Sequence, residues 1–367
     1  MSVVANPQAA PGWPDLLRSL LGGGDLSAHQ AAWAMQEILA GRASDAQIAG
    51  FAIALRAKGE TDIEVAALAA SMLAHAERIE VAGPVLDVVG TGGDHSGSVN
   101  ISTMAAVVAA ACAVPVVKHG NRAASSQTGT ADVLAELGVA ISLPPRAVAD
   151  CLAQVGIGFA FAPVHHPAMR HAAAARRDLG VPTVFNILGP LTNPAGAQAS
   201  LIGCADPRLA PIMAQVLAHR GACAIVVRGD DGLDEVSTAR PSTAWVAAGG
   251  EVRQDRIDVA DLGVRAARPQ DLVGGDPERN ASLLRMSLGM QEPSPGDSAR
   301  VAAIRDAVAV NAAAALVAWQ GIGQGIALPL VERIAEQLPR ARRAIDGGDA
   351  ADLMQRWQSV SQELAAG

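Results

Sequence analysis

The fold of this chain can be worked out from residues 85–103, which read Val85-Leu86-Asp87-Val88-Val89-Gly90-Thr91-Gly92-Gly93-Asp94-His95-Ser96-Gly97-Ser98-Val99-Asn100-Ile101-Ser102-Thr103. The first five residues are mostly apolar, which predicts a buried strand. Four glycines and several hydroxyls follow, and then Asn100 and Ser102, both good N-cap residues, precede an apolar run that ends at Cys112. A strand, a glycine turn and a helix N-terminus in this order favour phosphate binding, because glycine lets backbone N–H groups approach an anion.

The familiar phosphate-binding fingerprints do not match this stretch. The dinucleotide fingerprint requires glycine at position 95, where the chain has His95. A P-loop requires Gly-Lys-Ser/Thr, whereas Gly97 is followed directly by Ser98. Asp94 inside the loop suggests that a metal ion or ribose hydroxyls share the site. The alternative is a glycine-rich turn that binds no ligand.

Length and composition narrow the class of protein. The chain has 367 residues, enough for two domains with sizeable cores, and a net charge of −8, which argues against nucleic acid as a partner. No signal peptide is expected in residues 1–12, and the apolar run 104–117 is too short to span a membrane. Four scattered cysteines without metal-ligand spacing predict buried free thiols in a reducing compartment, hence the cytoplasm: Cys112, Cys151, Cys204 and Cys223.

Lysine occurs at only two positions, Lys58 and Lys118, while arginine is common. Lys118 follows an apolar segment that we predict to be a strand, and a compact ammonium charge would be useful there. The alternative is that Lys118 survives by chance in an arginine-rich chain.

Residues 13–80 predict a small all-helical domain, and we expect residues 1–12 to be disordered. Capping boxes begin three helix-length segments at Ser27, Ser44 and Thr61. The alanine-rich helices allow close packing, so this domain is also a candidate surface for a homodimer. A plain hydrophobic core is the alternative role for these residues.

The remainder of the chain predicts a larger α/β domain. A strand at 85–89, a helix at 102–112 and a strand at 114–117 form a βαβ unit with parallel strands. The polar loops 90–100 and 118–130 follow neighbouring strands, so they should face one crevice at the carboxyl end of a mainly parallel sheet. The second loop offers Lys118, Arg122 and several hydroxyls to an anion.

Three later stretches add candidate site residues. The adjacent His165 and His166 follow a predicted strand, and Arg176 or Arg177 on the next helix is a candidate partner for a carboxylate. The Pro- and Gly-rich residues 181–194 predict a hinge or a crossover between domains. Four acids follow a strand at 224–227, and the adjacent pair could hold Mg²⁺, unless the turn is simply solvated: Asp230, Asp231, Asp234 and Glu235. Short strands are expected at 243–262 and helices at 300–319, 328–345 and 349–363.

Taken together, these motifs are specific enough to indicate a family. Over roughly residues 13–345 the chain resembles the anthranilate phosphoribosyltransferases of tryptophan biosynthesis. The matching motifs are Gly90-Thr91-Gly92-Gly93-Asp94, Asn100-Ile101-Ser102-Thr103, Lys118-His119-Gly120-Asn121-Arg122, His166-Pro167, Asn186-Ile187-Leu188-Gly189-Pro190-Leu191-Thr192-Asn193-Pro194 and Asp234-Glu235.

The resemblance implies a reaction and an architecture. The amine of anthranilate attacks C1 of 5-phosphoribosyl 1-diphosphate (PRPP), giving N-(5-phosphoribosyl)anthranilate and diphosphate, with two Mg²⁺ ions per site. The fold is that of nucleoside phosphorylases and class III phosphoribosyltransferases, usually as a homodimer. The helical domain, residues 13–80 with a contribution from about 167–192, would join an α/β domain made of 81–166 and 193–367.

The resemblance also assigns roles to residues. Lys118 and His119 would be catalytic, and Ser102, Asp234 and Glu235 would bind Mg²⁺. Anthranilate would be held by Gly90, Asn121, His166 and Arg176. The PRPP site would comprise Gly90, Gly93, Asp94, Ser98, Asn100, Ile101, Ser102, Thr103, Lys118, Asn121, Arg122, Ala123, Ala124, Ser125, Ser126 and Thr130.

Two rival functions and one departure accompany this assignment. Many relatives carry an aromatic residue at the position of Met169, so the acceptor pocket is expected to differ in detail. A pyrimidine nucleoside phosphorylase would share the architecture, but its glycine loop typically begins Lys-His-Ser-Thr-Gly-Gly, unlike Val88-Val89-Gly90-Thr91-Gly92-Gly93. A non-catalytic homologue that binds nucleic acid or protein fits poorly with the negative charge and with the retained Lys118, Asp234 and Glu235.

Overall fold

The computed structural model describes residues 12–123, 127–327 and 329–367. The expectation of disorder at residues 1–12 therefore concerns a segment that, apart from Gly12, lies outside the described residues. The predicted PRPP contacts Ala124, Ser125 and Ser126 also lie outside them.

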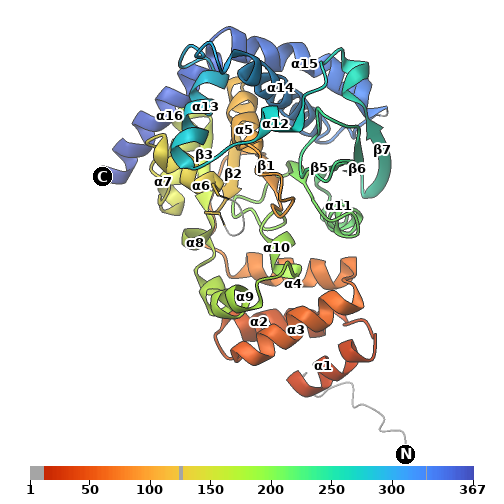
Figure 1. Cartoon of the computed structure of the whole chain (residues 1–367). Helices are drawn as coiled ribbons and strands as arrows, with labels where there is room; N and C mark the ends of the chain where they lie inside the picture. Colours follow the sequence, from red (N-terminus) through yellow and green to blue (C-terminus); the bar gives the residue numbers. More distant parts are fainter. Residues whose placement is uncertain (1–11, 124–126, 328) are drawn as a thin grey trace, which may run out of the picture.

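The N-terminal part of the chain is a helical unit, as predicted. It comprises α1 (Trp13–Leu21), α2 (Ala28–Leu39), α3 (Asp45–Lys58) and α4 (Asp62–Ala74), drawn in red and orange in Figure 1. Ser27, Ser44 and Thr61 each accept the backbone N–H three residues ahead, so all three predicted capping boxes are formed.

The rest of the chain is built on one seven-stranded sheet in the order β3-β2-β1-β4-β5-β6-β7. Neighbouring strands are parallel from β3 to β5, and β6 and β7 are antiparallel, which confirms the mainly parallel sheet. The strands are β1 (Leu86–Gly90), β2 (Val116–Gly120), β3 (Ile157–Phe161), β4 (Ala199–Gly203), β5 (Cys223–Gly229), β6 (Ser242–Ala248) and β7 (Glu251–Ile257). The prediction of strand structure through residue 262 was wrong at its end, where Val259–Leu262 form a 3₁₀ turn.

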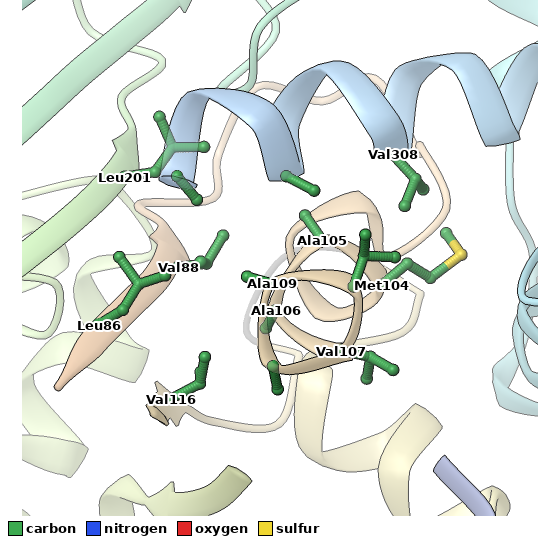
Figure 2. Packing of buried hydrophobic residues seen from close by; sticks show 14 of the residues in the cluster. Leu86, Val88, Met104, Ala105, Ala106, Val107, Ala109, Val116, Leu201 and Val308 are labelled. Atoms are coloured by element: carbon green, nitrogen blue, oxygen red, sulfur yellow. The ribbon is translucent and has the colours of Figure 1, made fainter. Parts of the chain in front are cut away.

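Two layers of helices cover the sheet, because its buried strands are apolar on both faces. One face packs mainly against α5 (Ile101–Ala111) and α14 (Ser298–Gln320), and Figure 2 shows Leu86, Val88 and Val116 directed at the alanines of α5. The outer helices of this layer are α6 (Thr130–Glu136), α7 (Pro145–Val155), α12 (Pro269–Leu272), α13 (Pro277–Ser287), α15 (Leu330–Asp346) and α16 (Asp349–Ala366). The other face packs against α11 (Leu209–His219) and joins a second apolar cluster shared with the helical unit.

The segment between β3 and β4 runs alongside the helical unit. It forms α8 (Ala162–His165), a 3₁₀ turn at Pro167–Ala172, α9 (Ala173–Leu179) and α10 (Val184–Leu188). Figure 1 shows α10 between the sheet and α4, and α9 beside the helices of the helical unit; their apolar side chains belong to the same buried cluster. The stretch predicted as a hinge or crossover thus contains a short helix that docks on α3 and α4.

Helix α14 is, among the described residues, the helix that is long and apolar enough to cross a membrane by length and composition. In this fold 78% of its most apolar window is buried inside the protein, against α5, α15 and the sheet. That burial is typical of a core helix.

Candidate active site

A cavity of about 590 Å³ lies between the carboxyl end of the sheet and the helical unit. Its walls come from the loops after β1, β2, β3 and β5, from α9 and α10, and from Met72 of α4. Chain connections run outward in both directions from β1, so the cavity sits at the switch point where open α/β sheets bind their ligands. The prediction that the loops 90–100 and 118–130 face one crevice is confirmed.

The glycine loop after β1 is held by a carboxylate and by a neighbouring strand. The Gly92 N–H donates to Asp234 Oδ2 (2.7 Å), and the Thr91 N–H donates to Gly203 O (2.9 Å). A Cβ at Gly90 would collide with the Asp234 carboxylate, so glycine is required there by space. Gly92 and Gly93 have φ of 66° and 82°, a backbone conformation that glycine adopts without strain.

The N-terminus of α5 differs in detail from the prediction. Asn100 is the N-cap residue, but its side chain makes no capping bond and instead joins the loop after β2 to α13, donating to Thr128 O (3.3 Å) and accepting from Asn280 Nδ2 (3.0 Å). Ser102 lies inside the helix, and its N–H donates to Glu235 Oε1 (3.1 Å). The helix N-terminus is therefore tied to the acidic pair.

The carboxylates of Asp94, Asp234 and Glu235 lie near one another in the cavity wall, close to the N-terminus of α5. Burial, and then the nearby Asp94 carboxylate, raises the pKa of Asp234 to about 8. Burial and the charge of Asp234 raise the pKa of Glu235 well above its usual range. The other two acids of the turn are directed elsewhere, since Asp230 pairs with Arg256 (2.9 Å) and Asp231 accepts from Ser237 Oγ (2.6 Å).

This donor set fits a magnesium ion that is completed by a ligand. Carboxylates that raise one another's pKa gain from a cation placed between them, and oxygen donors suit Mg²⁺. Within residues 12–123, 127–327 and 329–367, no three His, Cys, Asp or Glu side chains converge as a ready-made metal cage. Mg²⁺ is commonly held without such a cage, by one or two carboxylates together with substrate phosphates.

The sequence had suggested that Lys118 follows a strand, but Lys118 lies within β2. Its side chain is fully buried, and Nζ donates to Val88 O and to Ser102 Oγ (3.2 Å). Burial lowers the pKa of this ammonium, and the carboxylates of Asp87, Glu235 and Asp234 oppose that shift. Lys118 thus places a positive charge in the cavity wall beside the acidic pair.

Two neutral histidines form another part of the wall. His119 Nδ1 donates to Gly189 O (2.9 Å), His166 Nε2 donates to Thr192 O (2.9 Å), and the ring centroids are 5.2 Å apart. Burial lowers the pKa of His119 to about 3 and that of His166 to about 4. The buried Nε2 of His119 and Nδ1 of His166 have no hydrogen-bond partner among the described residues, so each is available as an acceptor. The adjacent His165 bonds Glu77 O instead.

The structure separates the two candidate arginines. Arg176 lines the cavity with its guanidinium 5.7 Å from the centre of the Phe185 ring, and no described carboxylate forms an ion pair with it. Arg177 points outward and lies beside Asp178 (3.5 Å) at a largely exposed position. A cation free to bind an acidic ligand therefore sits at the end of the cavity nearest the helical unit.

Almost all predicted site residues lie together. Of the nominated residues that the structure describes, Thr103 is outside the cavity lining, because its buried Oγ1 packs against Thr130 Oγ1 (3.3 Å). Lining residues that the sequence did not reveal come mainly from the segment between β3 and β4: Met72, Ala162, Ala173, Phe185, Asn186, Gly189 and Pro190. The motif at 186–194 pointed to Asn186, Gly189 and Pro190, although no site role was given to them, and no local sequence signal pointed to the other four.

Comparison with known proteins agrees with this geometry. Residues 14–76 match the helical bundle domain, and residues 82–351 the a/b domain, of a glycosyl transferase family. The anthranilate phosphoribosyltransferase of Saccharopolyspora erythraea is 52% identical over 97% of each chain, and that of Nocardioides sp. is 54% identical over 95% of this chain and 98% of the relative.

Solved structures are similar over nearly the whole chain. The enzyme from Thermus thermophilus is 39% identical with a TM-score of 0.83 over 95% of this chain and 99% of that one. The Saccharomyces cerevisiae enzyme in complex with PRPP and Mg is 26% identical with a TM-score of 0.84 over 96% and 98%. With these similarities and these motifs in one cavity, the chain belongs to the anthranilate phosphoribosyltransferase family.

Proposed function

We propose that the chain transfers the 5-phosphoribosyl group of PRPP to the amine of anthranilate, releasing diphosphate, in tryptophan biosynthesis. The observation that carries this proposal is the polarity of the cavity. One end holds a glycine loop, a buried lysine and an acidic pair, and the other end holds an arginine without a carboxylate partner among the described residues. The first set suits a diphosphate with its metal, and the second suits the carboxylate of an aromatic acid.

The donor PRPP is assigned to the end near the sheet. The loop at 90–98 and the N-terminus of α5 offer backbone N–H groups, and the loop at 121–130 offers further polar groups. Lys118 supplies a positive charge where the departing diphosphate gains negative charge.

Magnesium would be held by Asp234 and Glu235, with Ser102 close by, and we keep the expectation of two ions per site. The yeast relative's complex with PRPP and Mg supports Mg²⁺ here. Bound between carboxylates and diphosphate, the metal would supply Lewis-acid stabilisation of the leaving group.

Anthranilate is assigned to the Arg176 end, with Gly90, Asn121 and His166 along its sides. A yeast relative in complex with 4-fluoroanthranilate supports this acceptor class. The aromatic amine is a weak base and needs little prior deprotonation. His119 Nε2, a neutral acceptor without a hydrogen-bond partner among the described residues, is our candidate to take a hydrogen bond from it. Because an oxocarbenium-like carbon needs no strong nucleophile, most of the rate would come from positioning both substrates.

The assembly and compartment of the protein follow as further proposals. We keep the expectation of a homodimer through the helical unit, which exposes the apolar side chains of Leu21, Ile53 and Ile63. Four buried free thiols are consistent with a reducing cytoplasm. The packing of α9 and α10 supports assigning residues 167–192 to the helical domain, beside 13–80, and 81–166 with 193–367 to the α/β domain.

Removal of the Lys118 charge should weaken the binding of PRPP more than the binding of anthranilate. In Lys118→Met we expect the KM for PRPP to rise about tenfold or more, since a charge-assisted contact contributes about 1.5–3 kcal/mol, while the KM for anthranilate changes little. Steady-state kinetics with each substrate varied in turn measures this. Unaltered KM for PRPP in a folded variant would remove Lys118 from the donor site.

The raised pKa values predict how stability depends on pH without metal. The folded protein holds protons on Asp234 up to about pH 8, whereas the unfolded chain releases them near pH 4, so this contribution to the free energy of unfolding is lost as pH rises through 8. In EDTA we expect the melting temperature to fall from pH 6 to pH 9, and to fall less in Asp234→Asn. Added Mg²⁺ should reverse the loss for the parent protein. If the melting temperature falls equally with pH in the parent protein and in Asp234→Asn, the raised pKa of Asp234 is contradicted.

The experiment that tests the proposed function is identification of the product. Incubation with anthranilate, PRPP and Mg²⁺ should yield a species with the mass of N-(5-phosphoribosyl)anthranilate, and one diphosphate per product. Cleavage of thymidine by phosphate, with no reaction of anthranilate, would favour the phosphorylase instead.

A further inference from the structure

Asp87 is a buried carboxylate next to the cavity wall to which no role has been given above. It lies in β1, three residues before Gly90, and its side chain is fully buried. Asp87 Oδ1 accepts the backbone N–H of His119 (3.1 Å), and Oδ2 accepts from Asn193 Nδ2 (2.8 Å). Burial raises the pKa of Asp87 to about 6, and the nearby Lys118 ammonium limits that rise. The carboxylate therefore joins β2 to the end of the crossover segment.

The side-chain amide of Asn193 makes three hydrogen bonds to described residues, which use both of its N–H donors and one acceptor position of its oxygen. Nδ2 donates to Asp87 Oδ2 and to Val117 O (2.7 Å), and Oδ1 accepts the Ala195 N–H (2.9 Å). A flipped amide would lose all three bonds, so its orientation is fixed by its partners. Asn193 thereby fastens the crossover segment to β1 and β2 together.

The segment that Asn193 fastens also holds both histidines of the cavity. Gly189 O accepts from His119 Nδ1, and Thr192 O accepts from His166 Nε2. Their ring orientations and tautomers therefore depend on where residues 189–193 lie. On the other side, Lys118 Nζ donates to Val88 O and to Ser102 Oγ, and the charge of Asp87 is the carboxylate charge that acts most strongly on this ammonium.

We propose that Asp87, acting through Asn193, is a positioning residue for phosphoribosyl transfer. The pair holds residues 189–193 against the sheet and so sets the orientation of His119 and His166 and the place of Lys118. Asp87 lies outside the cavity lining and does not contact the substrates. This role rests on the proposed function, because it concerns groups that face PRPP and anthranilate.

Asp87→Asn tests the role with little change of volume. The new amide cannot accept hydrogen bonds at both positions, so its NH₂ meets another donor, and Lys118 loses a counter-charge. We expect kcat at saturating substrates to fall about 10- to 100-fold, the usual effect of removing a group that orients a site. Asn193→Ala should show a loss of the same kind, and the double variant should lose no more than the less active of the two single variants.

The chain offers a control and an internal probe. Ser361 is equally buried, and its Oγ accepts the Ala140 N–H (3.0 Å) far from the cavity, so Ser361→Ala should lower the melting temperature and leave kcat unchanged. Lys58 and Lys118 are the only lysines, so ¹³Cε-lysine labelling gives two resonances. The Lys118 resonance should move in Asp87→Asn, while that of Lys58, bound to Asp25 and Glu64, stays.

The outcomes separate this inference from the proposed function. If the parent protein does not turn over anthranilate and PRPP, the proposed function is contradicted, and so is the positioning role of Asp87 that rests on it. If the parent protein is active and folded Asp87→Asn has a kcat within twofold of the parent value, the positioning role alone is overturned. It is also overturned if the losses of kcat in the two single variants multiply in the double variant. If Asp87→Asn does not fold, Asn193→Ala decides, and a wild-type kcat there overturns the inference.

Discussion

Glu235→Gln is expected to lower kcat by about 100- to 1,000-fold, the range seen when one electrostatic group is removed from a preorganised site. Glutamine keeps an oxygen that accepts the Ser102 N–H, so the N-terminus of α5 should stay in place while the negative charge is lost. The expected loss therefore reports charge rather than shape. The assay is turnover as a function of Mg²⁺ concentration, in which the variant should also need more metal for half-maximal rate.

Asp230→Asn is the matched control for Glu235→Gln. It removes a charge from the same acidic turn, but Asp230 is exposed, pairs with Arg256 and lies outside the cavity lining. Its kinetics should match those of the parent protein. Equal Mg²⁺ dependence in Glu235→Gln and the parent would exclude a metal role for Glu235.

Arg176→Ala should raise the KM for anthranilate about 10- to 100-fold, as expected for loss of a charge-assisted hydrogen bond of about 1.5–3 kcal/mol. The guanidinium has no carboxylate partner among the described residues, so a substrate carboxylate is the charge it is placed to bind. The KM for PRPP should change little, because the donor is assigned to the opposite end of the cavity.

Arg177→Ala is the control for this prediction, since Arg177 is the adjacent arginine and points to solvent. It should behave like the parent protein with both substrates. Equal increases in KM for anthranilate and PRPP in Arg176→Ala would contradict a specific pairing with the acceptor carboxylate.

Local patterns predicted the parts of the site that are continuous in sequence. The glycine loop, the N-terminus of α5 and the acidic pair each follow a strand, and parallel strands bring their carboxyl ends to one edge. For the same reason the helical unit was predictable from its capping boxes, which depend on residues three positions apart. These features require no knowledge of distant packing.

The remaining features depend on tertiary packing. Whether Asp230 or Asp234 faces the cavity is decided by Arg256 and Gly92, which are remote in sequence. Lys118 was expected beyond its strand, but β2 extends to Gly120 because it pairs with β3 over its whole length. Met72 reaches the cavity only because residues 167–191 dock on the helical unit.

The fluorescence of anthranilate, followed after PRPP is added, tests the central claim most directly. With Mg²⁺ present the account predicts a steady loss of anthranilate fluorescence as its amine becomes substituted, and EDTA should stop that loss. Constant fluorescence with Mg²⁺, in folded protein shown to bind PRPP, would contradict anthranilate as the acceptor.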